Sequence, residues 1–420
     1  MTRAATAPVR TTVMAALGGV LEYFDFVLFA LLAQPLGDAF FPGEATPQIR
    51  LIKAFGLFAA GYLARPFGGL FFSHRADREG RKGVFAQTVA LMALTSAAIA
   101  ILPGYATLGI AAPALLLVLR ILQGLAFGGE LPGAMCFLAE QIPASHRCFA
   151  LGILIAAVNA GNLLAHGVIL VVSSTMSPSA FHDFGWRIPF VVGAFGGLFS
   201  IVIRNHMSET AVFEKMKAER RIVKVPVATL LREHAPTVAH MMALVAVHAA
   251  VISLFVLTLP SLLPLFTKLS ADESRTLATW VTAVSLPCYL LGGFLADRLG
   301  RRTTVITTLC GTICVAVPAF LLMSSGHELL GSIVGVVPPC LFVGAYLAGM
   351  VDAFPATVRT SGIGLSYNIG YAIVGGGIPS LVTWVIQQGA PSWTLGVVFG
   401  GIALLALIVE VVAPRPSYAA

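Results

Sequence analysis

Long apolar segments separated by short polar loops recur along the whole chain. An α-helix needs about 20 residues to cross the hydrocarbon core of a bilayer, and nearly all of these segments reach that length. The pattern predicts an all-α polytopic membrane protein with twelve transmembrane helices. They are expected at residues 12–34, 50–73, 83–102, 110–139, 149–172, 188–203, 236–262, 275–296, 303–324, 328–351, 360–386 and 392–413.

The longest polar stretch divides the predicted helices into two sets of six. This stretch, 204–235, carries many charges but also apolar residues such as Val212 and Phe213. The mixture is typical of short amphipathic helices that lie on a membrane surface. We therefore expect an N-terminal six-helix bundle over 1–203, a cytoplasmic linker with amphipathic helices over 204–235, and a C-terminal six-helix bundle over 236–420.

Two polar motifs occur once in each half of the chain. The segment 77–82 (DREGRK) returns as 297–302 (DRLGRR), and the pattern E-x-x-P-x-x-x-R at 140–147 returns as D-x-x-P-x-x-x-R at 352–359. Both copies follow equivalent predicted helices on the same side of the membrane, so the halves are parallel repeats. Such duplication is typical of secondary transporters that bind their substrate between the two bundles.

The composition excludes a water-soluble protein. Hydrophobic residues make up 57% of the chain and charged residues only 11%, whereas soluble globular domains are roughly 25% charged. So few charges cannot cover the apolar surface of a soluble fold, and disordered or coiled-coil chains are excluded for the same reason. The six cysteines show no metal-binding spacing, so we expect reduced core residues and no metal site.

Basic residues are distributed unequally between the two sets of loops. If the N-terminus lies inside, the inner loops and termini hold 19 lysines and arginines and the outer loops hold 4. This bias predicts that both termini are cytoplasmic. The net charge of +7 is therefore explained by membrane topology, and we expect the lipid bilayer but no nucleic acid as a partner.

The repeated D-R-x-G-R-[RK] loop resembles the signature of the major facilitator superfamily. Other motifs resemble its metabolite:proton symporter family. This resemblance implies an integral protein of a bacterial inner membrane. Segments 103–109 and 175–177 look most like the citrate and tricarballylate branch. The motifs similar to the family are G-x-x-E-x-x-D-F at 19–26, GYLARPFGG at 61–69, RILQG at 120–124, GGE at 128–130, GWRIPF at 185–190, FP at 354–355 and GLSYN at 364–368.

Three charged residues fall near the middle of predicted helices. At 1.5 Å per residue, Glu22 and Arg120 lie about 15 Å into the membrane and Asp25 about 20 Å. A charge in the bilayer costs at least about 2.5 kcal/mol, so such residues face a partner or a cavity. Arg65, by contrast, is expected towards the inner end of the second helix.

Two interpretations of these charges remain open. Glu22 and Arg120 are either a structural ion pair or part of a proton-coupling site. In the second case a substrate carboxylate binds Arg120 and lets Glu22 or Asp25 take up a proton. The resemblance adds Gln123, because the pattern R-x-x-Q-G is similar to the superfamily's proton-transfer motif.

Seven further polar residues in predicted helices are candidate substrate ligands. Each has a simpler interpretation, because a lysine near a helix end can reach the headgroups and a polar stripe can bond to a neighbouring helix. His240 and His248 are expected to be ordinary core residues. The candidate ligands are Lys53 in the second helix, Asn159, Asn162 and His166 on one face of the fifth, and Tyr367, Asn368 and Tyr371 in the eleventh.

The repeated motifs are candidates for an inner gate. Their charged residues are expected to bind one another or helix ends, and so to close the inner side when the site faces outward. Positive-inside topology alone is the alternative, but topology requires only basic residues, not aspartates and glycines. The candidate gating residues are Asp77, Arg81, Glu140, Arg147, Asp297, Arg301, Asp352 and Arg359.

We predict a monomeric transporter, not an enzyme, that imports a small organic acid together with protons by alternating access. The expected solute is a di- or tricarboxylate such as citrate. The alternatives are a proton symporter of a zwitterion such as betaine or proline, and a membrane receptor that does not transport. No phosphate-binding loop occurs in the sequence, so an ion gradient is the expected energy source and no cofactor is expected.

Overall fold

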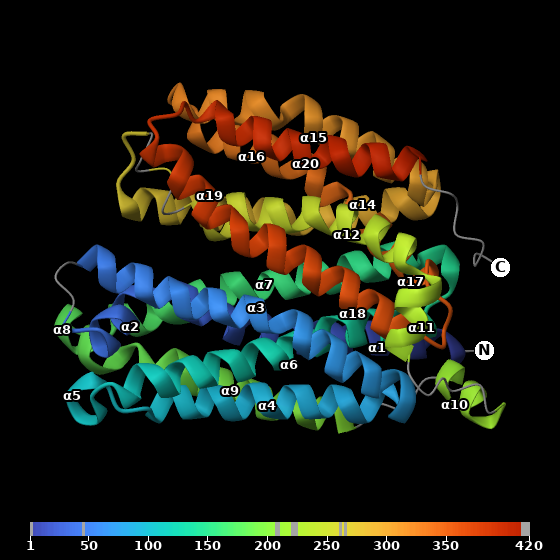
Figure 1. Cartoon of the computed structure of the whole chain (residues 1–420), viewed down its shortest axis with the longest axis horizontal. Helices are drawn as coiled ribbons and strands as arrows, with labels where there is room; N and C mark the ends of the chain where they lie inside the picture. The colour runs from blue at the N-terminus through green and yellow to red at the C-terminus, as the bar shows by residue number, and fades with distance from the viewer. Residues whose placement is uncertain are drawn as a thin grey trace.

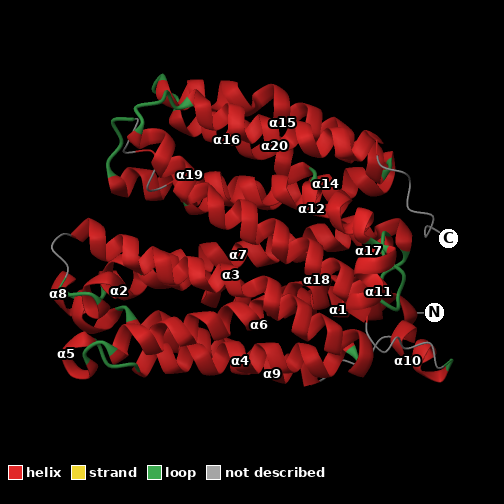
Figure 2. Cartoon of the chain, viewed as in Figure 1, coloured by secondary structure: helices red, strands yellow, loops and turns green. Residues whose placement is uncertain are grey.

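The computed structural model describes residues 3–43, 47–205, 211–219, 226–259, 263 and 267–412. Within these ranges every regular element is a helix, as Figure 2 shows. The predicted all-α class is confirmed. The elements form two bundles that lie side by side, and the chain completes the first bundle before it enters the second (Figure 1).

The first bundle runs from α1 to α9. In it α1 packs against α7 and α9, α3 against α6, and α4 against α6 and α9. Its elements are α1 (Arg3–Leu31), α2 (Ala33–Phe40), α3 (Pro47–Glu79), α4 (Arg81–Ile101), α5 (Tyr105–Leu108), α6 (Ala111–Gln141), the 3-10 turn η1 (Ala144–His146), α7 (Arg147–Ser174), α8 (Pro178–Ala180), the π-helical segment η2 (Phe181–Gly185) and α9 (Arg187–Asn205).

Two short helices, α10 (Ala211–Ala218) and α11 (Pro226–Glu233), lead to the second bundle. In the second bundle α12 packs against α20, α14 against α16, and α15 against α16 and α20. Its elements are α12 (Ala235–Val251), the π-helical segment η3 (Ile252–Leu257), α14 (Ala271–Leu299), α15 (Arg301–Ser324), α16 (Glu328–Leu341), α17 (Val343–Asp352), α18 (Arg359–Gly370), the π-helical segment η4 (Tyr371–Gly375), α19 (Gly376–Gln387) and α20 (Trp393–Val412).

The helices are long and apolar enough to span a bilayer. Among the described residues nine helices meet this criterion, or up to eleven if each of two bent pairs counts as one span. The bent pairs correspond to the predicted first and sixth spans. The predicted span at 360–386 is divided into α18 and α19 by the π-helical segment η4.

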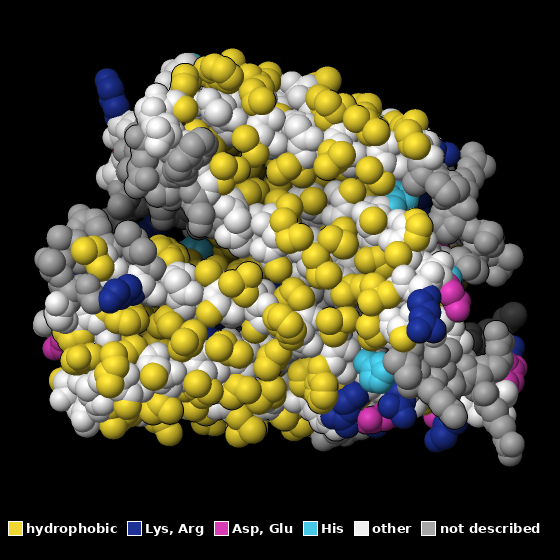
Figure 3. Space-filling model, viewed as in Figure 1, with side chains coloured by type: hydrophobic (Ala, Val, Ile, Leu, Met, Phe, Trp, Pro, Cys, Tyr) yellow, Lys and Arg dark blue, Asp and Glu magenta, His cyan; other side chains and the backbone are white. Residues whose placement is uncertain are grey.

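The two ends of the molecule differ. The start of α1 and the end of α20 lie at one end, while α5 and α8 lie at the other (Figure 1). Hydrophobic side chains cover most of the face between them, and charged side chains gather mainly at the end with the termini (Figure 3). We call that end the inner end, following the charge prediction, and the opposite one the outer end.

Glycines bring α3 and α6 into backbone contact. A Cβ added to Gly124 would lie 2.0 Å from the Gly61 carbonyl oxygen, and one added to Gly128 would lie 2.1 Å from the Arg65 carbonyl oxygen. Real Cβ atoms do not approach this closely, so only glycine fits at these crossings. Small residues are the usual means of packing helices closely in membranes. This contact fixes the middle of α3, and with it Arg65, against α6.

The bundles meet along two pairs of surfaces. On one side α7 packs against α14 and α17, and on the other α3 and α6 pack against α18. Every one of these contacts joins an element of the first bundle to an element of the second. A site between α3, α6, α7, α12 and α18 therefore receives side chains from both halves of the chain.

Candidate functional site

A cavity lies between the two bundles. Aromatic and aliphatic side chains make up most of its wall, and its polar groups come from both halves. Arg65 and Asn159 belong to the first half, and His248, Tyr367 and Tyr371 belong to the second. Concave, mostly apolar cavities with a few polar groups are the usual form of small-molecule sites.

Arg65 lies in this cavity with its guanidinium among aromatic rings. Its Cζ is 4.7 Å from the ring centre of Phe127, 4.9 Å from that of Tyr371 and 5.1 Å from that of Tyr62. Arg65 is 2% exposed to solvent. The expectation that Arg65 lies near the inner end of its helix is wrong, because α3 continues to Glu79 and Arg65 is therefore near its middle.

Asn368 holds this arginine in place across the bundle interface. Its Oδ1 accepts a hydrogen bond of 3.3 Å from Arg65 Nε. Its Nδ2 donates to the carbonyl oxygens of Gly128, at 2.7 Å, and Gly364, at 2.9 Å. Asn368 is fully buried and is not among the residues that line the cavity. Its place in the structure is that of a residue that orients Arg65.

The other candidate ligands are divided between the cavity wall and other places. Tyr367 and Tyr371 line the cavity with ring centres 4.6 Å apart. Asn159 lines it too, with Nδ2 donating to the Ile155 carbonyl oxygen at 3.0 Å. Within the described residues Asn159 Oδ1 has no hydrogen-bond partner. The structure therefore brings three of the seven candidates to the cavity.

Asn162, His166 and Lys53 lie outside the residues that line the cavity. His166 Nδ1 lies 2.9 Å from the Asn162 carbonyl oxygen, on the same helix. Lys53 is exposed, and its Nζ lies 5.6 Å from the ring centre of Phe41. At 1.5 Å per residue it is about 18 Å from Arg65 along α3. It lies near the start of α3, towards the outer end.

A second buried polar cluster lies inside the first bundle. Arg120 Nη1 donates to Gln123 Oε1 at 2.7 Å, and Gln123 Nε2 donates to Ser96 Oγ at 2.8 Å. Ser96 Oγ in turn donates to Asp25 Oδ2. All four side chains are nearly fully buried. This chain of hydrogen bonds joins α1, α4 and α6 and connects the carboxylate of Asp25 to the guanidinium of Arg120.

Asp25 is thus the acid that shares a hydrogen-bond network with Arg120. Glu22 lies on the adjoining part of α1, where its Oε1 accepts a hydrogen bond of 3.4 Å from Ser200 on α9. Arg120 and Gln123 are not among the cavity-lining residues. Arg120 packs on aromatic rings instead, with its Cζ 4.4 Å from the ring centre of Phe29.

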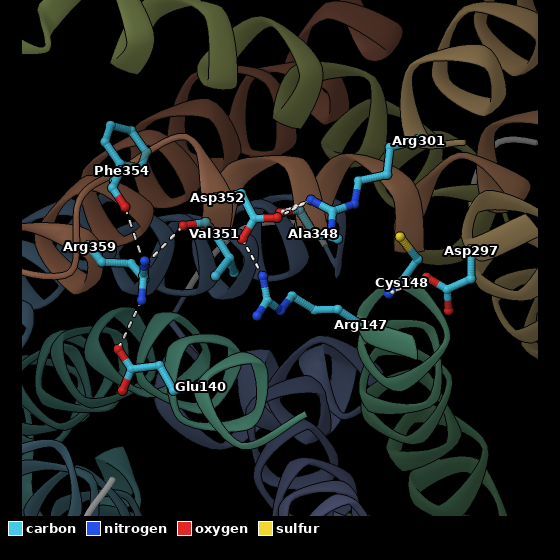
Figure 4. Close-up of polar contacts among 10 residues, drawn as sticks. All are labelled: Glu140, Arg147, Cys148, Asp297, Arg301, Ala348, Val351, Asp352, Phe354 and Arg359. Carbon is cyan, nitrogen blue, oxygen red and sulfur yellow. Dashed lines mark hydrogen bonds and ion pairs between the residues drawn. The ribbon is translucent and has the colours of Figure 1, made fainter. Parts of the chain in front are cut away.

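Ion pairs between the bundles lie at the inner end (Figure 4). Asp352 on α17 accepts hydrogen bonds from Arg147 of the first half and Arg301 of the second, one on each carboxylate oxygen. Arg359 Nη1 donates to Glu140 Oε1 at 3.2 Å, again across the interface. Two of the three pairs therefore tie one bundle to the other.

Asp77 caps a helix of the opposite bundle at the same end. It accepts hydrogen bonds from the backbone N–H of Thr360, at 3.3 Å, and of Ser361, at 2.9 Å. These amides are among the free donors that begin α18, and a carboxylate is favoured at a helix N-terminus. The first signature loop therefore binds a helix end across the interface.

Asp297 does the same from the second half. It accepts from the backbone N–H of Cys148, at 3.1 Å, and of Phe149, at 2.9 Å, at the start of α7. The two aspartates are thus arranged as a pseudo-symmetric pair of caps. Arg81 begins α4, but its side chain lies outside the part of the chain that the structure describes.

The inner end is held together by these contacts, while the surface is hollowed between the bundles towards the outer end (Figure 3).

The profile described as Major Facilitator Superfamily matches residues 15–358. The chain belongs to this superfamily. Its members are transporters, so the prediction of a membrane transporter and not an enzyme is confirmed.

Two relatives agree with this assignment. The proline/betaine transporter of Salmonella typhimurium (strain LT2) is 31% identical over 386 residues, which cover 89% of this chain and 77% of that protein. The proline/betaine transporter of Escherichia coli (strain K12) is 30% identical over the same shares.

Two solved structures have the same fold as this chain. The proton:xylose symporter XylE bound to 6-bromo-6-deoxy-D-glucose matches with a TM-score of 0.79 at 16% identity, over 98% of this chain and 97% of that chain. The human organic anion transporter MFSD10 matches with a TM-score of 0.72 at 15% identity, over 96% and 99%.

The reasoning from sequence did not name three residues of the cavity and of the buried polar cluster of this major facilitator as candidates. Arg65 was visible as a charge in an apolar segment, and only its depth was misjudged. Ser96 gives no signal, since a serine in a membrane helix commonly bonds to its own backbone. His248 is a histidine in an apolar helix, which sequence alone cannot distinguish from a core residue.

Proposed function

We propose that this chain is a proton-coupled symporter that imports a small zwitterionic solute of the betaine or proline type. The observation that carries the proposal is the single buried guanidinium of Arg65 in an aromatic cavity between the bundles. Arginine binds a carboxylate through two parallel hydrogen bonds, and aromatic faces attract an ammonium group. The cavity therefore suits a molecule that has both.

The same lining argues against citrate, the solute predicted from sequence. Among the described residues that line the cavity, Arg65 is the one permanent cation. A tricarboxylate would bring two further negative charges into an apolar site without partners, which is costly. The names of the two relatives, both proline/betaine transporters, support the zwitterion alternative.

Asp25 is the proposed proton-binding group. In its charged form it accepts the Ser96 hydrogen bond and attracts Arg120. Protonation removes the charge, and with it the electrostatic part of this network. The network is then free to change its geometry, which is what a coupling site requires.

The ring of Phe26, the neighbour of Asp25 in the sequence, connects the two sites. It lies 5.9 Å from Arg65 Cζ and 5.2 Å from Arg120 Cζ, measured from its centre. It also stacks on Phe127 with ring centres 4.5 Å apart. A carboxylate that moves Arg65 therefore displaces the ring next to Asp25, and protonation of Asp25 acts on the cavity by the same contact.

The ion pairs and caps at the inner end are the proposed gate. With them formed, the solute reaches the cavity from outside, and their rupture opens the cavity to the cytoplasm. We place both termini in the cytoplasm and the protein in a bacterial inner membrane, and we expect a monomer to suffice, because one chain supplies both bundles.

Uptake into proteoliposomes with an imposed pH gradient tests this function. Radiolabelled glycine betaine or proline should accumulate in wild-type vesicles when the outside is acidic, and a protonophore should abolish the accumulation. Accumulation of citrate instead would restore the organic-acid interpretation. Binding without accumulation of any solute would favour the receptor.

A further inference from the structure

His248 lies on α12, in the wall of the cavity that the second bundle provides. It is 1% exposed, and its ring is surrounded by the rings of Tyr289, Tyr346 and Tyr371, with centres 6.3, 5.7 and 5.7 Å away. Its Nδ1 lies 2.6 Å from the hydroxyl of Tyr346. Among the described residues its Nε2 has no hydrogen-bond partner, although the side chain lines the cavity.

The contact with Tyr346 fixes which nitrogen carries the proton. Within the described part of the chain, the Tyr346 hydroxyl bonds to no group except His248 Nδ1. A buried hydroxyl needs an acceptor for its proton, so Tyr346 donates and Nδ1 accepts. In a neutral imidazole the other nitrogen then bears the hydrogen. His248 therefore presents an Nε2–H donor to the cavity.

The cavity thus receives a donor from each half of the protein. Tyr371 places the two donors near each other, because its ring centre lies 4.9 Å from Arg65 Cζ and 5.7 Å from the ring centre of His248. Arg65 contributes a positive charge and His248 contributes none. One charge matches one carboxylate, so a neutral second donor adds selectivity without favouring dicarboxylates.

We propose that His248 is the substrate-binding residue of the second bundle and that its Nε2–H donates to an oxygen of the solute held by Arg65. The inference rests on the proposed function and adds a specific contact to it. A solute bound in this way is hydrogen-bonded to both bundles at once. It therefore stabilises the state in which the bundles close around it, as alternating access requires.

Tyr346 acts in this proposal as a positioning residue. It holds the imidazole in the tautomer that presents a donor, and it does not touch the solute. Without its hydroxyl the proton can move to Nδ1, and the cavity then faces an acceptor. The effect of Tyr346 on binding must therefore pass through His248, which a double-mutant cycle measures directly.

The test is the binding of glycine betaine, proline and citrate to the purified full-length chain in nanodiscs, measured by calorimetry. His248→Phe keeps a ring but removes the donor, and it should raise Kd about tenfold, the scale of one lost hydrogen bond. His248→Gln keeps an N–H donor and should stay within about threefold of wild type. His327→Gln, at an exposed position near the outer end, is the matched control and should change nothing.

Tyr346→Phe should raise Kd about threefold in wild type and have no effect in the His248→Phe background. If His248→Phe fails to fold, His248→Asn takes its place, since its amide is one methylene too short and should bind as weakly. Equal binding by wild type and by a folded His248→Phe or His248→Asn protein would overturn the role of His248 and leave the proposed function intact. A wild type that binds none of the three probes would refute the proposed solute class and this contact with it.

Discussion

A substitution at Asp352 is the sharpest test of the proposed inner gate. Its two carboxylate oxygens serve different arginines, Arg147 across the interface and Arg301 within the second bundle. Asn at this position has one acceptor oxygen and an amide group that cannot accept. Asp352→Asn therefore keeps the shape of the side chain but loses one of the two bonds and the charge behind both.

The magnitude follows from the exposure of the pair. A hydrogen bond to a charged group contributes about 1.5–3 kcal/mol when buried, and partial exposure lowers this value. The side chains of Arg147 and Asp352 are 19% and 20% exposed, so we use the lower end. A loss of about 1.4 kcal/mol is tenfold in an equilibrium constant, so the closed-to-open ratio of the inner gate should fall about tenfold.

Hydrogen–deuterium exchange can read this ratio at two places. The amides of Cys148 and Phe149 bond to Asp297, and those of Thr360 and Ser361 bond to Asp77, in each case across the interface. Separation of the bundles breaks these bonds and exposes the amides to solvent. Peptides that contain these helix starts should exchange about tenfold faster in Asp352→Asn, since exchange follows the population of the open state.

Glu410→Gln is the matched control. Glu410 is another partly buried carboxylate at the inner end, but its partners, His240 at 2.7 Å and Arg302 at 3.8 Å, both belong to its own bundle. Its loss should lower the melting temperature without changing exchange at the two helix starts. Unchanged exchange in a folded Asp352→Asn protein, or an equal increase in Glu410→Gln, would refute the gate as argued.

Three other outcomes are expected. Asp25→Asn should abolish accumulation driven by a pH gradient and largely spare solute exchange without a gradient. Glu22→Gln should still accumulate solute. If a folded Asp25→Asn protein loses both accumulation and exchange, the polar cluster has a structural role instead. Arg65→Lys keeps the charge but loses the two-bond geometry, so Kd for glycine betaine should rise at least about tenfold in calorimetry, and unchanged affinity would place the carboxylate elsewhere. Gly128→Ala forces a Cβ within 2.1 Å of the Arg65 carbonyl oxygen and should destabilise the protein by about 1–3 kcal/mol. Gly83→Ala, with nothing within 4 Å of the added Cβ, should not; equal melting temperatures would show that α3 and α6 can separate at no cost.

The apolar pattern was sufficient to predict the class of fold. In a bilayer every backbone polar group must be satisfied within its own segment or barrel, so long apolar runs have almost no alternative to helices. Repeated motifs then indicated two parallel halves, because equivalent loops on one side of the membrane require it. The type of the gating residues was visible for the same reason, since aspartates in a basic loop need a specific partner.

The partners themselves depend on tertiary structure. That Asp352 joins Arg147 to Arg301 follows only when α7, α15 and α17 meet at the inner end. The choice of Asp25 as the acid connected to Arg120 depends on which faces of α1, α4 and α6 turn towards one another. A shift of three residues changes the direction of a helical side chain by about 60°, since each residue turns about 100°, so spacing alone left Glu22 and Asp25 equivalent.

The position of the proposed solute site depends on tertiary structure in the same way. Depth counted from a predicted helix end placed Arg120 at the centre and Arg65 near the inner end, because the prediction ended the second helix at residue 73 whereas α3 continues to Glu79. His248 was interpreted as a core residue, because a histidine in an apolar helix gives no sign of a cavity. The free energy of burying apolar side chains in lipid decides which segments cross the membrane, and this can be estimated from sequence. It does not distinguish a side chain that lines a cavity from one that packs in a core. Only the packing of the two bundles, with glycines that let α3 approach α6, determines which of them face the cavity.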